Sequence, residues 1–276
     1  MTAQPNLTAQ DFKSDIKPIW CPGCGDYAVL AAMTKALAES GRKREDIAFI
    51  SGIGCSSRIP AYTNVYGFHG VHGRALAIAA GVKLARPELT VVAAGGDGDG
   101  FSIGGNHFMH ACRRNVDMTY IIMDNEVYGM TKGQASPTTA SDWCNSKLTP
   151  EGTGISPVEP VRLALAAGAN FIARGFAGNP NEVARLIVEG INHPGFSFIQ
   201  VLSPCVTYRP EQREWKNAVH ASAETSPAQL IAEAMHRLAS DDGFTTGVLF
   251  AGNRPAFMPE RKTTASFADF ERKFAS

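Results

Sequence analysis

The chain has 276 residues, of which 44% are hydrophobic and 19% are charged, so it can bury a sizeable core and is not disordered. Its 26 lysines and arginines balance 26 aspartates and glutamates, which argues against binding to nucleic acid or to an anionic membrane surface. Its apolar runs are too short to cross a bilayer, and residues 1–17 lack the apolar segment of a secretory signal. We therefore expect a cytoplasmic protein.

Helices and strands are predicted to alternate after a polar arm over residues 1–17. Helical spacing of apolar residues indicates the helices, and short apolar runs between them indicate the strands. This alternation predicts an α/β fold with a doubly wound, mostly parallel sheet. In chain order we expect a helix over 26–40, a strand over 47–50, a helix over 70–85, a strand over 89–94, a helix over 104–113, a strand over 118–123, a helix over 157–167, a strand over 171–173, a helix over 181–192 and a strand over 196–202.

The last part of the chain, residues 204–276, has a different character. It contains one predicted helix over 227–239, a short apolar run over 247–250 and a polar tail. We expect a C-terminal extension that docks on the main domain, residues 18–203, or on a partner.

Two polar residues, Asp97 and Asn125, each follow a predicted strand, and one strand–helix–strand unit separates them. Asp97 lies in the run Gly95–Gly100, and Asn125 comes 28 positions later, after the next strand. Because ligands bind at the carboxyl ends of parallel strands, one strand–helix–strand crossover can place both side chains on the same edge. Glycines there let a diphosphate approach the backbone, and carboxylate and amide oxygens suit Mg²⁺. Taken singly, each motif would be interpreted as a tight turn or a surface loop, and only the pair at this spacing favours a cofactor site.

Four of the six cysteines flank irregular, glycine-rich backbone where their sulfurs can converge. Cys21 and Cys24 form a C-x-x-C loop, Cys55 lies in a second glycine turn, and Cys205 follows a predicted strand. Four such thiolates can bind Zn²⁺ or an iron–sulfur cluster, and a C-x-x-C pair can also be a redox pair. The spacing alone leaves these alternatives open.

The ordered set of motifs is more specific than any one of them. Cys-Pro-Gly-Cys-Gly, Gly-Ile-Gly-Cys-Ser, His-Gly-Arg, Gly-Asp-Gly-Asp-Gly, Asp-Asn-Glu-Val-Tyr-Gly-Met-Thr-Lys-Gly-Gln and Ser-Pro-Cys follow one another along the chain. Over residues 18–210 the chain resembles the β subunit of 2-oxoacid:ferredoxin oxidoreductases, and most closely the 2-oxoglutarate branch. The resemblance implies a fold that binds thiamine diphosphate.

The same resemblance implies the roles of individual residues. Mg²⁺ would be held by Asp97, Asn125 and the carbonyl of Val127, and a [4Fe–4S] cluster, rather than zinc, by Cys21, Cys24, Cys55 and Cys205. The remaining thiamine contacts would be Ile53, Gly54, Cys55, Ser56, His72, Gly96, Gly98, Asp99, Gly129 and Met130.

Three further residues are assigned from the resemblance. Lys132 matches a lysine associated with coenzyme A, and Arg58 and His72 are expected at the catalytic centre. Some relatives carry lysine where this chain has Arg58. Because the arginine fork suits a carboxylate, we expect a dicarboxylate substrate such as 2-oxoglutarate.

The implied reaction is the coenzyme A-dependent oxidative decarboxylation of 2-oxoglutarate to succinyl-CoA and CO₂, with reduction of ferredoxin. The reverse reaction would fix CO₂, as in a reductive tricarboxylic acid cycle. The family also implies a separate α subunit, which contacts the aminopyrimidine ring, so we expect this chain to work only in an αβ or (αβ)₂ assembly. The alternatives are a β subunit that uses pyruvate or a branched-chain 2-oxoacid, a thiamine-dependent decarboxylase with structural zinc, and a zinc-stapled binding module without catalysis.

Overall fold

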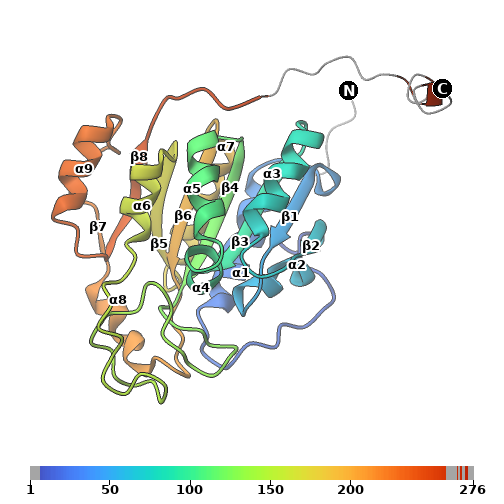
Figure 1. The fold of residues 1–276 in the computed structure, drawn as a ribbon. Helices are drawn as coiled ribbons and strands as arrows, with labels where there is room; N and C mark the ends of the chain where they lie inside the picture. Colours follow the sequence, from blue (N-terminus) through green and yellow to red (C-terminus); the bar gives the residue numbers. More distant parts are fainter. Residues whose placement is uncertain (1–6, 259–265, 267, 269–270, 273–276) are drawn as a thin grey trace.

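A mostly parallel sheet forms the centre of the computed structural model, which describes residues 7–258, 266, 268 and 271–272 (Figure 1). The predicted arm therefore lies outside the described residues at 1–6, and the predicted extension at 259–265, 267, 269–270 and 273–276. The strands lie in the order β2-β1-β3-β4-β6-β5-β8-β7, and every pair is parallel except β5 with β8. Their bounds are β1 Ile47–Ser51, β2 Tyr66–His69, β3 Thr90–Gly96, β4 Met118–Asp124, β5 Phe171–Phe176, β6 Phe196–Leu202, β7 His220–Ala221 and β8 Thr245–Ala251.

Helices cover both faces of this sheet, which confirms the predicted doubly wound α/β fold. One core layer contains α3, α5, α6 and α9, and the other contains α1, α2 and α7. None of the helices in the described part of the chain combines the length and apolar character needed to span a membrane. The helices are α1 Asp26–Glu39, α2 Ile59–Tyr62, α3 Ala75–Ala85, α4 Asp97–Phe101, α5 Gly105–Arg114, α6 Pro160–Ala167, α7 Pro180–Asn192, α8 Trp215–Ala218 and α9 Ile231–Ala239, with 3₁₀ turns η1 Arg44–Asp46, η2 Ser56–Arg58 and η3 Pro210–Glu214.

Strand β4 shows why the apolar runs become central strands. Met118, Tyr120 and Ile122 pack into the layer of α3, α5 and α6, whereas Ile121 and Met123 pack into the layer of α1 and α7. Successive side chains of a strand point to opposite faces, so a strand covered on both faces is largely apolar rather than alternating. All seven residues of β4 are buried.

Two predicted helices begin later than expected. The helix predicted over 70–85 begins at Ala75, because Gly73 has a φ of +70° and its N–H donates to the side chain of Asp99. The helix predicted over 227–239 begins at Ile231, because Ala228 instead pairs with Phe250 of β8. In both cases a long-range contact fixes an extended or turning backbone where the local sequence favours a helix.

Strands β2 and β8 were not predicted as members of the sheet. Strand β2 is an edge strand whose four residues are all exposed, so its sequence lacks the alternation of a half-buried strand. Strand β8 pairs antiparallel with β5, and the chain beyond it is held by a hydrogen bond from Asn115 Nδ2 to the carbonyl of Pro255 at 2.9 Å. Within the described residues, β7 and β8 of the predicted extension therefore add to the edge of the sheet.

The four adjacent strands β1, β3, β4 and β6 end at the same edge. Cys55 follows β1, Asp97 follows β3, Asn125 follows β4 and Cys205 follows β6. Because all four strands are parallel, residues far apart in the chain meet at one edge. This edge is where a ligand is expected in an open α/β sheet.

Candidate active site

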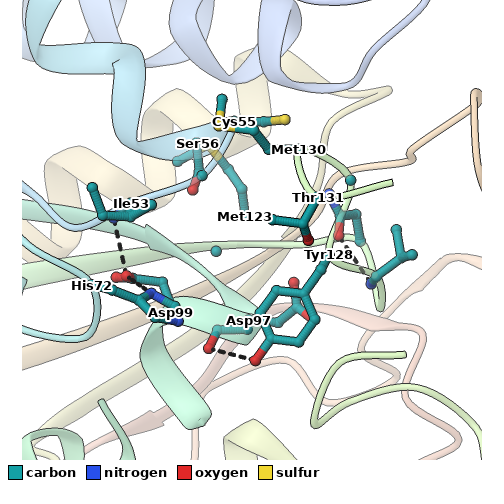
Figure 2. A pocket seen from close by; sticks show the side chains of 16 residues that line it. Ile53, Cys55, Ser56, His72, Asp97, Asp99, Met123, Tyr128, Met130 and Thr131 are labelled. Carbon is teal, nitrogen blue, oxygen red and sulfur yellow. Dashed lines mark hydrogen bonds and ion pairs between the residues drawn. The ribbon is translucent and has the colours of Figure 1, made fainter. Parts of the chain in front are cut away.

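A cavity of about 230 Å³ opens at this edge (Figure 2). It is lined by every residue predicted to contact thiamine or Mg²⁺, together with three that were not predicted: Met123, Tyr128 and Thr131. In Figure 2, Cys55 and Met130 lie toward one end of the group and Asp97, Asp99 and His72 toward the other. The predicted lining residues are Ile53, Gly54, Cys55, Ser56, His72, Gly96, Asp97, Gly98, Asp99, Asn125, Val127, Gly129 and Met130.

Asp97 is an almost completely buried carboxyl group at the start of α4, with 1% of its surface exposed. Its Oδ2 accepts hydrogen bonds from Ser136 and, at 2.9 Å, from Thr138 Oγ1, which also lies 2.9 Å from Asp124 Oδ1. Burial, and then the neighbouring Asp124 carboxyl, raise the pKa of Asp97 to about 7. Two buried carboxyl groups side by side favour a bound cation, which stabilises their charged forms.

The loop after β4 brings two further candidate metal ligands to the cavity, the side-chain oxygen of Asn125 and the main-chain carbonyl of Val127. The N–H of Val127 donates to Asn125 Oδ1 at 3.1 Å, and Glu126 between them has a left-handed φ of +53°. Asp97, Asn125 and Val127 all line the cavity. A carboxylate, an amide oxygen and a main-chain carbonyl are hard ligands of the kind that Mg²⁺ takes, so this set fits the predicted metal.

At Gly54 and Gly98 the main chain lines the cavity without side chains. A Cβ on Gly98 would lie 2.2 Å from Cε1 of Tyr128, whose hydroxyl donates to the carbonyl of Gly98 at 3.2 Å. Gly54 has a φ of +103°, a conformation that residues with a side chain rarely adopt. A bound diphosphate needs this close approach to main-chain atoms, so the cradle fits the predicted cofactor.

Asp99 ties three parts of the site together. Its Oδ1 accepts hydrogen bonds from the N–H of Ile53 at 3.0 Å and of Gly73 at 2.8 Å, and it lies 2.7 Å from Nδ1 of His72. The His72 side chain is 41% exposed, whereas that of Asp99 is 2% exposed. The buried carboxylate therefore sets the position of a histidine that faces the cavity.

The C-x-x-C loop packs against the segment that carries Cys205. The N–H of Gly25 donates to the carbonyl of Pro204 at 3.1 Å, and a Cβ on Gly25 would lie 2.6 Å from Ser203 Oγ. This close contact brings the loop of Cys21 and Cys24 to the end of β6. Glycine at position 25 is thus required by a backbone-to-backbone approach.

Cys55 and Cys205 both lie close to a glycine of the cavity wall. A Cβ on Gly129 would be 3.6 Å from Cys205 Sγ and 3.8 Å from Cys55 Sγ. Gly129 itself lines the cavity. The thiols therefore adjoin the cavity at the end that Cys55 and Met130 form.

All four predicted cysteines are electrostatic neighbours. Burial, followed by the charge of Asp26, raises the pKa of the Cys55 thiol to about 11 and that of Cys24 further still, and Cys205 and Cys21 contribute to the shift of Cys55. Burial also raises the pKa of Cys205. Buried thiols of this kind become thiolates when a bound cation compensates their charge. Yet no three His, Cys, Asp or Glu side chains in the described parts of the chain are placed to hold a single metal ion.

Arg58 and Lys132 lie outside the cavity lining. Arg58 belongs to η2, and its guanidinium lowers the pKa of Cys55, so it lies near that thiol. Lys132 is exposed at the tip of the loop between Tyr128 and Gln134, with a left-handed φ of +88°. Their assigned roles stay predictions.

Sequence reasoning missed the residues that support the site from outside the cavity. Ser136 and Thr138 hold Asp97, and Arg209 forms an ion pair with Glu126 at 3.0 Å. Burial, and then Asp124, raise the pKa of Glu126 to about 8 in spite of this partner. Apart from the polar residues around Pro137, no local pattern marks these positions, because their role depends on contacts between distant segments.

The sequence and the fold are similar to those of known proteins. Residues 52–201 match the family described as thiamine pyrophosphate enzyme, C-terminal TPP binding domain. The chain is 47% identical over 204 residues to the 2-oxoglutarate oxidoreductase subunit KorB of Mycobacterium tuberculosis, which is 74% of this chain and 54% of that protein. It is 46% identical over 202 residues to the 2-oxoglutarate synthase subunit KorB of Archaeoglobus fulgidus, which is 73% of this chain and 75% of that protein.

A solved structure extends the likeness beyond the cofactor domain. The 2-oxoglutarate:ferredoxin oxidoreductase of Magnetococcus marinus, with 2-oxoglutarate, coenzyme A and succinyl-CoA bound, is 40% identical with a TM-score of 0.88, over 92% of this chain and 88% of that one. The match to the mycobacterial relative spans only about half of that protein's length. The chain belongs to the thiamine pyrophosphate-binding enzymes and, among them, to the β subunits of the 2-oxoacid:ferredoxin oxidoreductases.

Proposed function

We propose that this chain is the β subunit of a 2-oxoglutarate:ferredoxin oxidoreductase that forms succinyl-CoA and CO₂ with coenzyme A and can run in reverse. One observation carries the proposal. One cavity is lined by oxygen ligands suited to Mg²⁺, at Asp97, Asn125 and Val127. Its wall at Gly129 lies close to the predicted cluster cysteines. This arrangement supports a thiamine diphosphate site with an electron acceptor beside it.

The residues at the two ends of the cavity would have separate tasks. Asp97, Asn125 and the carbonyl of Val127 would hold Mg²⁺, and the bare backbone at Gly96 and Gly98 would accept the diphosphate. When bound, thiamine diphosphate supplies the nucleophile and the electron sink for decarboxylation, and an iron–sulfur cluster supplies one-electron transfer. The protein contributes position and electrostatics, and Asp99 holds His72 at the cavity.

Two features support a [4Fe–4S] cluster over zinc at the cysteines. The pKa values of Cys24, Cys55 and Cys205 are each raised in part by other thiols of the set, Cys21 included. A cluster needs thiolates around a larger body than a single tetrahedral ion does. Its position beside Gly129 would also put it next to the cavity.

In this proposal Arg58 would select the substrate and Lys132 would bind coenzyme A. The names of the relatives support the choice of 2-oxoglutarate. The Magnetococcus marinus enzyme binds 2-oxoglutarate and coenzyme A, and the mycobacterial and archaeal relatives are named for 2-oxoglutarate. Arg58 lies near Cys55, where a guanidinium fork can bind the distal carboxylate of a dicarboxylate. The exposed loop that carries Lys132 is accessible to coenzyme A.

The enzyme would need a second subunit. Relatives of this chain are named as subunits, and the cavity supplies the metal and diphosphate end of a thiamine site. An α subunit that contacts the aminopyrimidine ring would complete it in an αβ or (αβ)₂ assembly. Reduction of ferredoxin with coenzyme A as the acyl acceptor fits an enzyme of the cytoplasm.

Reconstitution tests the proposal directly. The chain is purified with its α partner, and viologen or ferredoxin reduction is measured with coenzyme A and 2-oxoglutarate, pyruvate or a branched-chain 2-oxoacid, alongside iron and acid-labile sulfide. We expect 2-oxoglutarate to give the highest kcat/KM and the Arg58→Leu variant to lose this preference. Higher kcat/KM with pyruvate would overturn the substrate, zinc in place of iron would overturn the cluster, and turnover by the chain alone would overturn the need for the α subunit.

A further inference from the structure

The buried side chain of Gln212 forms hydrogen bonds with Asn125, a predicted ligand of Mg²⁺, and with Cys205, a predicted ligand of the iron–sulfur cluster. Its Nε2 donates to the main-chain carbonyl of Asn125 at 2.8 Å, and its Oε1 accepts from the N–H of Cys205 at 2.8 Å. Gln212 is 1% exposed. A single amide group therefore joins the loop of the proposed magnesium site to a proposed ligand of the cluster.

The segment around Gln212 is braced so that the amide has little freedom to move. The N–H of Gln212 donates to the carbonyl of Arg209 at 3.0 Å, and the N–H of Arg209 donates to the carbonyl of Cys205 at 2.8 Å. Arg209 in turn donates to the carbonyl of Glu126 at 3.1 Å and pairs with its carboxylate. Residues 205–212 thus fold back onto the loop after β4 at two adjacent points.

The chemistry of the two partners fixes the orientation of the amide. A main-chain N–H can only donate and a main-chain carbonyl can only accept, so Oε1 must face Cys205 and Nε2 must face Asn125. A carboxylate of the same length satisfies Cys205 but places an oxygen against the carbonyl of Asn125. An aliphatic side chain satisfies neither partner and leaves both buried groups without this bond.

We infer that Gln212 is a positioning residue that sets the magnesium loop and the cluster ligand relative to each other, through one amide bonded to Asn125 and Cys205. This inference rests on the proposed function, because it takes Asn125 and Cys205 as ligands of the two cofactors. Groups that hold the ligands of a metal from behind influence its affinity. The hydrogen bonds and charges around a cluster influence its reduction potential.

The N–H of Cys205 has a particular consequence for the cluster. Because it is bonded to Gln212 Oε1, it does not donate to a sulfur of the cluster. Removing the acceptor releases this N–H and moves the reduction potential upward, since hydrogen bonds to cluster sulfurs stabilise the reduced state. Keeping the acceptor but adding a negative charge moves the potential downward.

The experiment compares Gln212→Leu and Gln212→Glu in the complex with the α subunit, at an alkaline pH at which a buried glutamate is ionised. The matched control is Glu214→Gln, on the exposed side of the same turn, where Glu214 accepts from Asn217. The readouts are the Kd of Mg²⁺ by calorimetry at saturating thiamine diphosphate, iron and sulfide content, the electron paramagnetic resonance spectrum of the reduced cluster and its midpoint potential.

Both sites should respond to Gln212→Leu. We expect the Kd of Mg²⁺ to rise about tenfold, and the reduced-cluster spectrum and the midpoint potential to shift, the latter upward. Gln212→Glu should also raise the Kd of Mg²⁺ but lower the potential, and Glu214→Gln should match the wild type. A role confined to the folding of η3 would lower the thermal midpoint and leave the Kd and the potential unchanged.

The outcomes separate the inference from the proposed function. A wild-type complex without iron and sulfide refutes the proposed cluster. A wild-type complex with a full cluster refutes the role of Gln212 if Gln212→Leu changes neither site or only one of them. If Gln212→Leu does not fold, Gln212→Glu decides, because a wild-type Kd for Mg²⁺ in that variant also refutes the role.

Discussion

Oδ1 of Asp99 lies 2.7 Å from Nδ1 of His72 and accepts hydrogen bonds from two main-chain N–H groups as well. A carboxylate can only accept, so Nδ1 of His72 carries the proton in this pair. The neutral ring then has its lone pair at Nε2. Asp99 thus determines both the orientation and the tautomer of a histidine at the cavity.

Replacing Asp99 by leucine should destabilise the protein. The substitution leaves the buried N–H of Gly73 and the partly buried N–H of Ile53 without their acceptor, and the loss of a buried acceptor costs about 1–3 kcal/mol. We expect the free energy of unfolding to fall by about 2–4 kcal/mol in chemical denaturation. Asp99→Asn keeps an acceptor at Oδ1 and should cost less. In a double-mutant cycle, equal effects of His72→Ala in wild type and in Asp99→Leu would contradict the pairing.

Two glycines should respond to alanine in opposite directions. A Cβ on Gly52 would lie 1.9 Å from Oδ2 of Asp99, so Gly52→Ala must displace that carboxylate and should cost about 1–3 kcal/mol of unfolding free energy. Gly81 is exposed within α3 and a Cβ there meets open space. Gly81→Ala should therefore stabilise the protein by up to about 1 kcal/mol. Urea denaturation of both variants measures the difference, and a loss of stability in Gly81→Ala would count against the contacts described for α3.

Thr138→Val should weaken Mg²⁺ binding with little change of shape. The hydroxyl of Thr138 lies 2.9 Å from both Asp97 and Asp124, and its loss removes an orienting hydrogen bond from the proposed metal ligand. We expect the Kd of Mg²⁺ to rise about tenfold in calorimetry with thiamine diphosphate present.

The matched control for this substitution is Thr149→Val. The hydroxyl of Thr149 is buried without a hydrogen-bond partner among the described residues, so its removal should leave the Kd of Mg²⁺ unchanged and the fold as stable or more so. Equal affinities in the two variants would argue that Thr138 does not orient Asp97.

Two histidines should give opposite dependences of stability on pH. Burial lowers the pKa of His193 from its ordinary 6.5, so the unfolded chain binds its proton more tightly and stability falls as the pH drops below 6.5. The hydrogen bond to Asp242 raises the pKa of His220 from the same value. His220 therefore contributes stability below pH 6.5 and loses it as the pH rises through its folded pKa.

Thermal unfolding between pH 5 and 8 measures both contributions. Relative to the wild type, His193→Gln should gain stability at the acidic end, and His220→Gln should lose stability there. Changes of the same sign in the two variants would contradict the environments that the structure gives these rings.

The sequence by itself determined the local elements and the chemistry of the motifs. The apolar runs and helical spacings predicted the order of helices and strands, because a strand such as β4, which is covered on both faces, is largely apolar. Glycine turns after strands mark residues such as Asp97 and Cys55 as candidate ligands, because such turns lie at the carboxyl edge of a parallel sheet. Their catalytic and binding roles stay predictions, although the structure places them around one cavity.

Only the tertiary structure decided which distant residues support that cavity. Thr138 reaches Asp97 across 41 positions, and Gln212 reaches Asn125 across 87, and neither contact leaves a periodic signal in the chain. The order of strands is set by packing on both faces of the sheet, and it places β6 beside β4 although β5 precedes it in sequence. Spacing along the chain reports on local backbone geometry, whereas the meeting of Cys205 with Cys55 depends on this order of strands.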